Sequence, residues 1–157
     1  VKEERTHIES YLEIQQFRYQ DILDYEVQMD EKIYGYIIPK LTLQPLVENA
    51  LYHGIKNKRG KGKILITGKK QGDKIIFQVI DNGKGMTEEE LNSLRKKMAG
   101  TDTGDEAKGF GVSNVNQRIK YYYGEEYGVF FESKENEGTN ATIIIAAKNF
   151  ELPSYNN

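Results

Sequence analysis

The sequence predicts an α+β fold. Two long segments, 1–21 and 41–56, carry apolar residues at the spacing of a helix that buries one face. Four short runs, at 63–69, 74–81, 128–133 and 140–147, have the length and the bounding turns of strands. A short connection joins each pair of strands, and Gln71-Gly72-Asp73 predicts a hairpin. We therefore expect helices packed on a sheet.

Length and composition exclude several classes of protein. The 157 residues suffice for one domain with a substantial core, and the net charge of −2 argues against a partner that is a polyanion. The basic segment 57–62 lacks interleaved aromatic residues, so we interpret it as a solvated turn and not as a nucleic-acid site. Cysteine is absent, which excludes disulfides, and no apolar run approaches the 18 residues of a membrane span.

The chain divides into three parts. Residues 1–21 predict an N-terminal helix, 22–148 a globular domain that opens with a strand at 22–29, and 149–157 a frayed polar tail. Because Val1 falls in the middle of a helical pattern, we expect the chain to be a piece of a longer protein. His7 lies on this first helix. It is either a phosphoacceptor or, more simply, a partly exposed helical histidine.

The predicted helix at 41–56 has two distinct faces at 100° per residue. The apolar face holds Leu43, Leu46, Val47, Ala50, Leu51 and Gly54. A different face holds Asn49, Tyr52, His53 and Lys56, at i, i+3, i+4 and i+7. An amide oxygen can bind Mg²⁺ and an ammonium group can bind phosphate, so this face is a candidate ligand surface. The alternative is an ordinary solvated face.

The strand at 74–81 ends in Asp81, followed by two glycines in Asn82-Gly83-Lys84-Gly85-Met86. Side chains alternate along a strand, so Asp81 shares a face with Ile75, Phe77 and Val79 and points toward the core. An ionised carboxylate accepts hydrogen bonds and donates none, so this position calls for a donor such as an exocyclic amine. The glycines allow the backbone to approach a flat ligand. A simple turn at the end of a strand is the alternative.

A helix follows from the capping residue Thr87 to about Met98, because Glu90 stands three residues after the threonine. The polar, glycine-containing segment 99–108 predicts a mobile lid. Gly109-Phe110-Gly111 then opens a helix at Val112, and the N-terminus of such a helix suits a phosphate group. Neither a Rossmann fingerprint nor a P-loop is present.

These motifs in this order resemble the GHKL ATPases, which carry the HATPase_c domain. The runs Leu43-Gln44-Pro45-Leu46-Val47-Glu48-Asn49-Ala50-Leu51-Tyr52-His53-Gly54 and Gly109-Phe110-Gly111-Val112-Ser113-Asn114, followed by Tyr122-Tyr123-Gly124, are similar to the catalytic domain of sensor histidine kinases of the LytS/YesM type. The resemblance implies a Bergerat-type two-layer α/β sandwich, with a mixed, mostly antiparallel sheet on about three helices. It covers nearly the whole chain, from about Tyr11 to Ile145.

The resemblance also implies a role for each matching residue. Asp81 would accept from the adenine amino group of ATP, assisted by Gly85 and by its neighbours Gly83 and Met86. Asn49 would bind Mg²⁺, and His53 and Lys56 would lie near the ribose and phosphates, where Lys56 would neutralise charge in catalysis. Backbone at Gly109, Gly111 and Val112 would hold phosphate. Thr139 or Thr142 would support the adenine end.

The chain departs from the family pattern in two respects. Pro45 stands where several branches carry an acidic residue, four positions before Asn49, so efficient activation of water is not expected. Glu48 is a weaker candidate for a catalytic carboxylate, because one helical step turns it about 100° away from Asn49. The acceptor histidine of this branch lies in an Asn-Pro-His-Phe context, which neither His7 nor His53 has.

The resemblance therefore implies a kinase domain that binds ATP or ADP and donates phosphate to a histidine outside this chain. Its implied partners are the upstream phosphoacceptor helices, which would continue from residues 1–21, and a response regulator. The parent protein would be a homodimer anchored in the cell membrane, with this domain in the cytoplasm. The alternatives are another GHKL ATPase, a serine kinase of the anti-sigma-factor type, or a module that has lost nucleotide.

Overall fold

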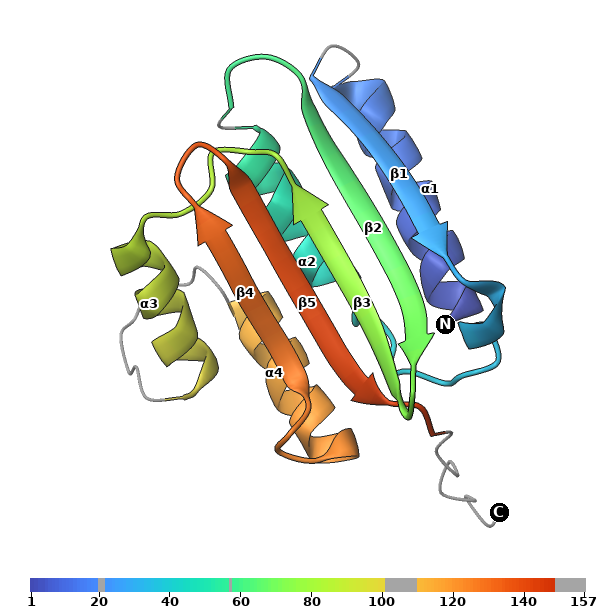
Figure 1. The fold of residues 1–157 in the computed structure, drawn as a ribbon. Coiled ribbons are helices and arrows are strands. Elements are labelled where there is room, and N and C mark those ends of the chain that lie inside the picture. The colour runs from blue at the N-terminus through green and yellow to red at the C-terminus, as the bar shows by residue number, and fades with distance from the viewer. Residues whose placement is uncertain (20–21, 57, 101–109, 149–157) are drawn as a thin grey trace.

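The computed structural model of the chain describes residues 1–19, 22–56, 58–100 and 110–148. The predicted tail at 149–157 and all but residues 99 and 100 of the predicted lid lie outside these described residues. Figure 1 shows one sheet with helices behind one of its faces. The α+β prediction is therefore confirmed.

Five strands form the sheet in the order β1-β2-β3-β5-β4. Their bounds are β1 Leu23–Met29, β2 Gly62–Gln71, β3 Lys74–Asp81, β4 Gly128–Lys134 and β5 Gly138–Ala146. Strand β1 is parallel to β2, and the other neighbours are antiparallel. The sheet is thus mixed and mostly antiparallel, as expected.

The α-helices of the described residues are α1 Lys2–Arg18, α2 Gln44–Asn49, α3 Glu88–Met98 and α4 Phe110–Tyr123. The resemblance implied about three helices packed on the sheet, and three of these four do so. Helices α1, α2 and α4 cover one face of the sheet, while α3 lies beside β4 (Figure 1). A short 3₁₀ turn, η1 Glu31–Ile33, follows β1, and a π-helical turn, η2 Ala50–Ile55, follows α2.

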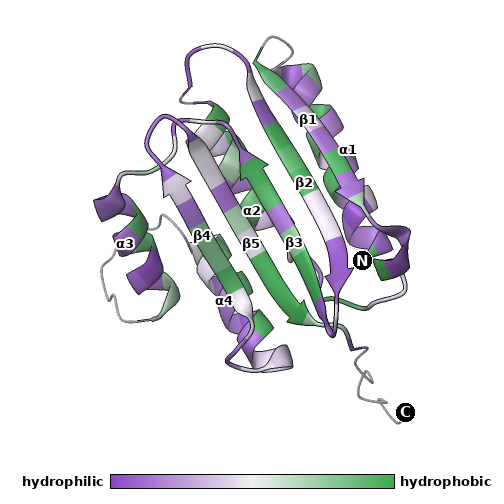
Figure 2. Ribbon diagram, in the orientation of Figure 1, coloured by the Kyte–Doolittle hydropathy of each residue, from purple (hydrophilic) through white to green (hydrophobic). Residues whose placement is uncertain are grey.

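The core lies between the sheet and these helices. Figure 2 shows apolar residues along the middle of β2, β3 and β5. On β3, Ile75, Phe77 and Val79 are buried, and Asp81 at the end of the same face is only 5% exposed. The predicted inward face of this strand is therefore correct, and it carries a carboxylate into the interior.

The helix predicted at 41–56 changes its winding in the middle. Residues 44–49 are α-helical, but from Ala50 the chain forms a π-turn, in which the backbone N–H of Lys56 donates to the carbonyl of Leu51 at 3.0 Å. A π-turn rotates the following side chains relative to an α-helix. The apolar face survives, because Leu46, Val47, Leu51 and Ile55 are all buried. The polar row does not remain in one line.

Candidate functional site

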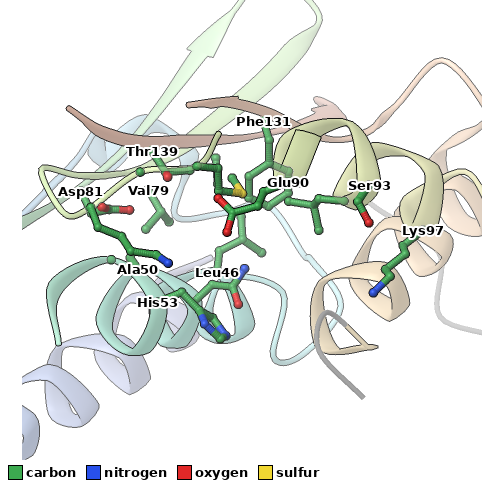
Figure 3. A pocket seen from close by; sticks show the side chains of 17 residues that line it. Leu46, Ala50, His53, Val79, Asp81, Glu90, Ser93, Lys97, Phe131 and Thr139 are labelled. Carbon is green, nitrogen blue, oxygen red and sulfur yellow. The ribbon is translucent and has the colours of Figure 1, made fainter. Parts of the chain in front are cut away.

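A pocket of about 350 Å³ opens between the sheet and the helices. Its walls come from α2 and η2, the end of β3 and the loop after it, α3, and the strands β4 and β5 (Figure 3). Six of the predicted site residues line it: Asn49, His53, Asp81, Gly85, Met86 and Thr139. Its size is typical of small-molecule sites. The fold thus brings residues as distant in the sequence as Asn49 and Thr139 into one cavity.

Asp81 is the buried acid of the pocket. Burial raises the pKa of its carboxyl group to about 6, and hydrogen bonds from the backbone of Gly83 and Thr139, together with the positive charge of Lys58, limit the rise. The N–H of Gly83 donates to Oδ1 at 2.8 Å. Among the described residues, no cation lies within ion-pair distance of this carboxylate. The remaining acceptor capacity of Asp81 is therefore available to a donor on a ligand.

Glycines allow the strand end and the π-turn to touch. A Cβ atom on Gly54 would lie 2.5 Å from Oδ1 of Asp81, and one on Gly83 would lie 2.4 Å from the backbone of Gly54. Gly83 does not line the pocket; its missing side chain serves this close contact instead. Gly85 does line the pocket, with a φ of +65° that favours glycine.

Thr139 and Thr142 lie on opposite faces of β5. Thr139 pairs with Asp81 across the sheet, lines the pocket, and its hydroxyl lies 2.8 Å from that of Ser133. The Ser133 hydroxyl also accepts from the N–H of Met86, which ties the glycine loop to β4. Thr142 pairs with Gln78 and lies on the face that the helices do not cover, because strand side chains alternate. The structure therefore does not bring Thr142 into the site.

The predicted polar row divides into two pairs, because Asn49 and His53 face the pocket while Tyr52 and Lys56 contact each other. The Lys56 ammonium instead lies 3.8 Å from the ring centroid of Tyr52 and 4.7 Å from that of Tyr19 at the end of α1. Lys56 does not line the pocket, so its role in phosphate binding and catalysis stays a prediction that this geometry does not favour.

Glu48 lies on α2 but outside the pocket. Its carboxylate accepts a hydrogen bond from Gln44 at 2.8 Å, and the side-chain oxygen of Gln44 in turn contacts His7 on α1. This polar chain connects the two helices. A catalytic role for Glu48 stays a prediction.

The second glycine motif is only partly described. Gly109 lies outside the described residues, and α4 begins at Phe110, two residues earlier than expected. Gly111 therefore belongs to the first turn of the helix, where an added Cβ would lie 3.4 Å from Pro45. The side chain of Val112 is buried in the core, so only its backbone remains for a ligand.

Sequence reasoning missed one wall of the pocket. Helix α3, capped by Thr87 and Glu90 as predicted, presents Glu90, Ser93, Leu94 and Lys97 to the cavity. These residues stand at i, i+3, i+4 and i+7, so they share one helix face. The spacing was visible in the sequence, but nothing local indicated which partner the face meets.

The arrangement fits a purine nucleotide. Asp81 and Thr139 mark one end, and Leu46, Val79 and Phe131 supply apolar walls for a flat ring. Among residues 1–19, 22–56, 58–100 and 110–148, no group of three or more histidine, cysteine or acidic side chains could hold a metal ion. The Asn49 amide oxygen suits Mg²⁺, which takes few protein ligands when it is bound through phosphates.

Comparisons with known proteins agree with this geometry. The profile of the family described as "Histidine kinase-, DNA gyrase B-, and HSP90-like ATPase" matches residues 39–149. Sensor histidine kinase YesM of Bacillus subtilis is 34% identical over 95% of this chain and 24% of its own length. Sensor protein LytS of Staphylococcus saprophyticus is 30% identical over 96% of this chain and 25% of its own length. This chain thus spans about a quarter of these relatives, and the resemblance inferred from the motifs is confirmed.

The solved catalytic domain of histidine kinase ThkA has the same fold. It superposes with a TM-score of 0.69 at 19% identity, covering 95% of this chain and 94% of that one. Within the described ranges, none of the helices combines the length and the apolar character needed to span a bilayer.

Proposed function

Because this chain belongs to the family of histidine kinase-, DNA gyrase B- and HSP90-like ATPases, we propose that it is the catalytic domain of a LytS/YesM-type sensor kinase. It binds ATP in the pocket beside Asp81 and donates the γ-phosphoryl group to a histidine elsewhere in the parent protein. The single observation that carries this proposal is the buried carboxylate of Asp81, which forms no ion pair within the described residues and opens into a nucleotide-sized cavity.

The adenine end follows from the chemistry of Asp81. The carboxylate accepts from the exocyclic amine of adenine, a contact that guanine cannot reproduce with its carbonyl oxygen at the equivalent position. The Thr139 hydroxyl supports the same end, and Gly85 and Met86 let the loop backbone lie against the ring. A mismatch at a buried polar group costs about 1–3 kcal/mol, so this end discriminates between purines.

The phosphoryl transfer needs little covalent chemistry from this chain. The bond between the γ-phosphorus and its bridging oxygen breaks, a bond from the acceptor imidazole nitrogen to phosphorus forms, and ADP leaves while the imidazole loses its proton. Mg²⁺ bound with Asn49 would neutralise phosphate charge. Catalysis on this scheme rests on position and charge neutralisation.

The partners follow from the same scheme. The parent protein supplies the phosphoacceptor helices upstream of α1, dimerises through them, and passes the phosphoryl group to a response regulator. The solved complex of histidine kinase ThkA with the response regulator TrrA supports this last partner. We also propose that the parent protein is a sensor, like YesM and LytS, and that it is anchored in the cell membrane with this domain in the cytoplasm.

Calorimetric titration tests nucleotide binding. ADP and a non-hydrolysable ATP analogue should give saturable heat, and Mg²⁺ should increase their affinity. The Asn49→Ala variant should retain binding but lose most of the gain from Mg²⁺. Absence of saturable heat with either ligand contradicts the proposal.

Phosphotransfer is tested with labelled ATP and a separate polypeptide that carries the acceptor helices. We expect acid-labile label on the histidine of that polypeptide and none on this chain alone. His7→Gln serves as the control, because it should not change the result. Label on serine would instead favour the serine-kinase alternative, and rapid release of free phosphate would favour a hydrolysing ATPase.

A further inference from the structure

We propose that Lys97 on α3 binds the phosphate chain of the nucleotide, a role that the sequence had assigned to Lys56. This inference rests on the proposed function and names a residue that completes its site. Lys97 and Asp81 mark opposite ends of the pocket, with Glu90 and Ser93 between them (Figure 3). A nucleotide that places adenine on Asp81 therefore extends its anionic part toward Lys97.

The spacing along α3 supports this direction. Glu90 and Lys97 are seven residues apart on one helix face, which corresponds to a rise of about 10 Å. Glu90 is held at the start of the helix by its hydrogen bond from the N–H of Thr87, at 2.9 Å. Its negative charge repels phosphate from that end of α3. The helix wall thus changes from acidic to basic in the direction in which the nucleotide extends.

The Lys97 ammonium is available for a ligand. It has no hydrogen bond or ion pair to any side chain in the described part of the chain. The other pocket lysine, Lys84, stands in the glycine loop only three residues from Asp81, at the adenine end. Lys56 lies against two tyrosine rings outside the pocket. Of these three cations, only Lys97 stands at the end away from adenine.

Helix α3 is fixed firmly enough to present this lysine. Arg95 donates from its guanidinium to the carbonyl of Phe131 on β4, at 3.1 Å. Asn116 of α4, itself 5% exposed, donates to the carbonyl of Met98 at 3.1 Å and accepts from the N–H of Val129 at 2.9 Å. Met98, the residue next to Lys97, is therefore bonded to α4, and Asn116 and Arg95 link this end of α3 to the sheet, which preorganises the lysine for binding.

The test compares ligands with and without phosphate. ADP and adenosine are titrated calorimetrically into the 157-residue chain and into its Lys97→Met, Lys97→Arg and Lys96→Met variants. Lys96→Met is the matched control, because the neighbouring side chain does not line the pocket. Thermal unfolding of each variant establishes that it folds.

Lys97→Met should lower the affinity for ADP about 10-fold, the usual effect of losing a charge-assisted contact. The affinity for adenosine should change by less than about twofold. Lys97→Arg should recover most of the ADP affinity, and Lys96→Met should leave the affinity for both ligands unchanged. The salt dependence of ADP binding should also be smaller in Lys97→Met, since a screened charge is gone.

The outcomes separate this inference from the function on which it rests. If the unaltered chain binds ADP tightly and Lys97→Met binds it equally well, the assignment of Lys97 is wrong and the proposed function stands. An equal loss of affinity for ADP and adenosine in Lys97→Met would also overturn the assignment, because such a loss would indicate a general disturbance of the pocket. If the unaltered chain binds neither ligand, the proposed function fails and this inference fails with it.

Discussion

The two ends of the pocket are built on different physical principles. At the adenine end, Asp81 is 5% exposed, packed against the glycine of the π-turn and hydrogen-bonded by backbone. At the other end, Lys97 is a half-buried side chain on a helix face. On the proposed function, one end would recognise adenine by shape and by a desolvated acceptor, and the other end would attract phosphate by a screened charge. Selectivity for the base and affinity for phosphate should therefore respond to different substitutions.

The largest effect is expected from Gly54→Ala. The added Cβ would lie 2.5 Å from Oδ1 of Asp81, so the carboxylate or the π-turn must move. Overpacking of this kind lowers the free energy of unfolding by about 1–3 kcal/mol, and a displaced recognition group weakens binding about 100-fold. ADP and adenosine should lose affinity equally in calorimetric titrations. Gly35→Ala is the control, because nothing lies within 4 Å of its added Cβ.

Asp81→Asn should weaken the binding of ADP and of adenosine by about 1–3 kcal/mol and yet stabilise the free protein. Burial disfavours the charged carboxylate, and asparagine keeps an oxygen that accepts from Gly83, but its amide nitrogen cannot accept from the N–H of Thr139. With a pKa of about 6 against an ordinary 3.8, removing the charge contributes about 3 kcal/mol to the free energy of unfolding at pH 7, and the lost Thr139 bond reduces the net gain to about 1–2 kcal/mol. Urea denaturation measures the gain. A variant that is less stable, or that binds adenosine normally, would contradict this account of the adenine end.

The pH dependence of adenosine binding should report the same carboxylate. Between pH 3.8 and about 6 the folded protein binds more protons at Asp81 than the unfolded chain does, so the contribution of this group to stability falls as pH rises through about 6. Binding of the amine needs the ionised form, so adenosine affinity should fall up to tenfold per unit as pH decreases below about 6. Asp81→Asn should show no such dependence. Adenosine is the ligand of choice because it carries no titrating phosphate.

Lys56→Met should have the smallest effect on binding. The ammonium contacts Tyr19 and Tyr52 outside the pocket, so ADP affinity should change by less than about twofold. A small decrease in thermal stability is expected, because the contact joins η2 to the end of α1. A loss of ADP affinity as large as that of Lys97→Met would restore the original assignment of phosphate binding to Lys56.

Much of the fold followed from local pattern. The alternation along 74–81 predicted an inward Asp81, and Thr87 with Glu90 predicted the start of α3, because both signals act within a few residues. The α-helical periodicity assumed through 41–56 was less reliable. It correctly located the buried face but placed Lys56 in line with Asn49. The pattern of apolar residues does not distinguish a π-turn from an α-helical turn over so few residues.

The sequence by itself determined the chemistry of the site: an inward acid, an amide on a buried helix and glycines where chains meet. Only the tertiary structure decided which cation stands at the far end of the pocket and which threonine of β5 faces it. Local interactions set the direction of a side chain relative to its own element. The partner that it meets depends on how distant elements pack, and no short stretch of sequence encodes that packing.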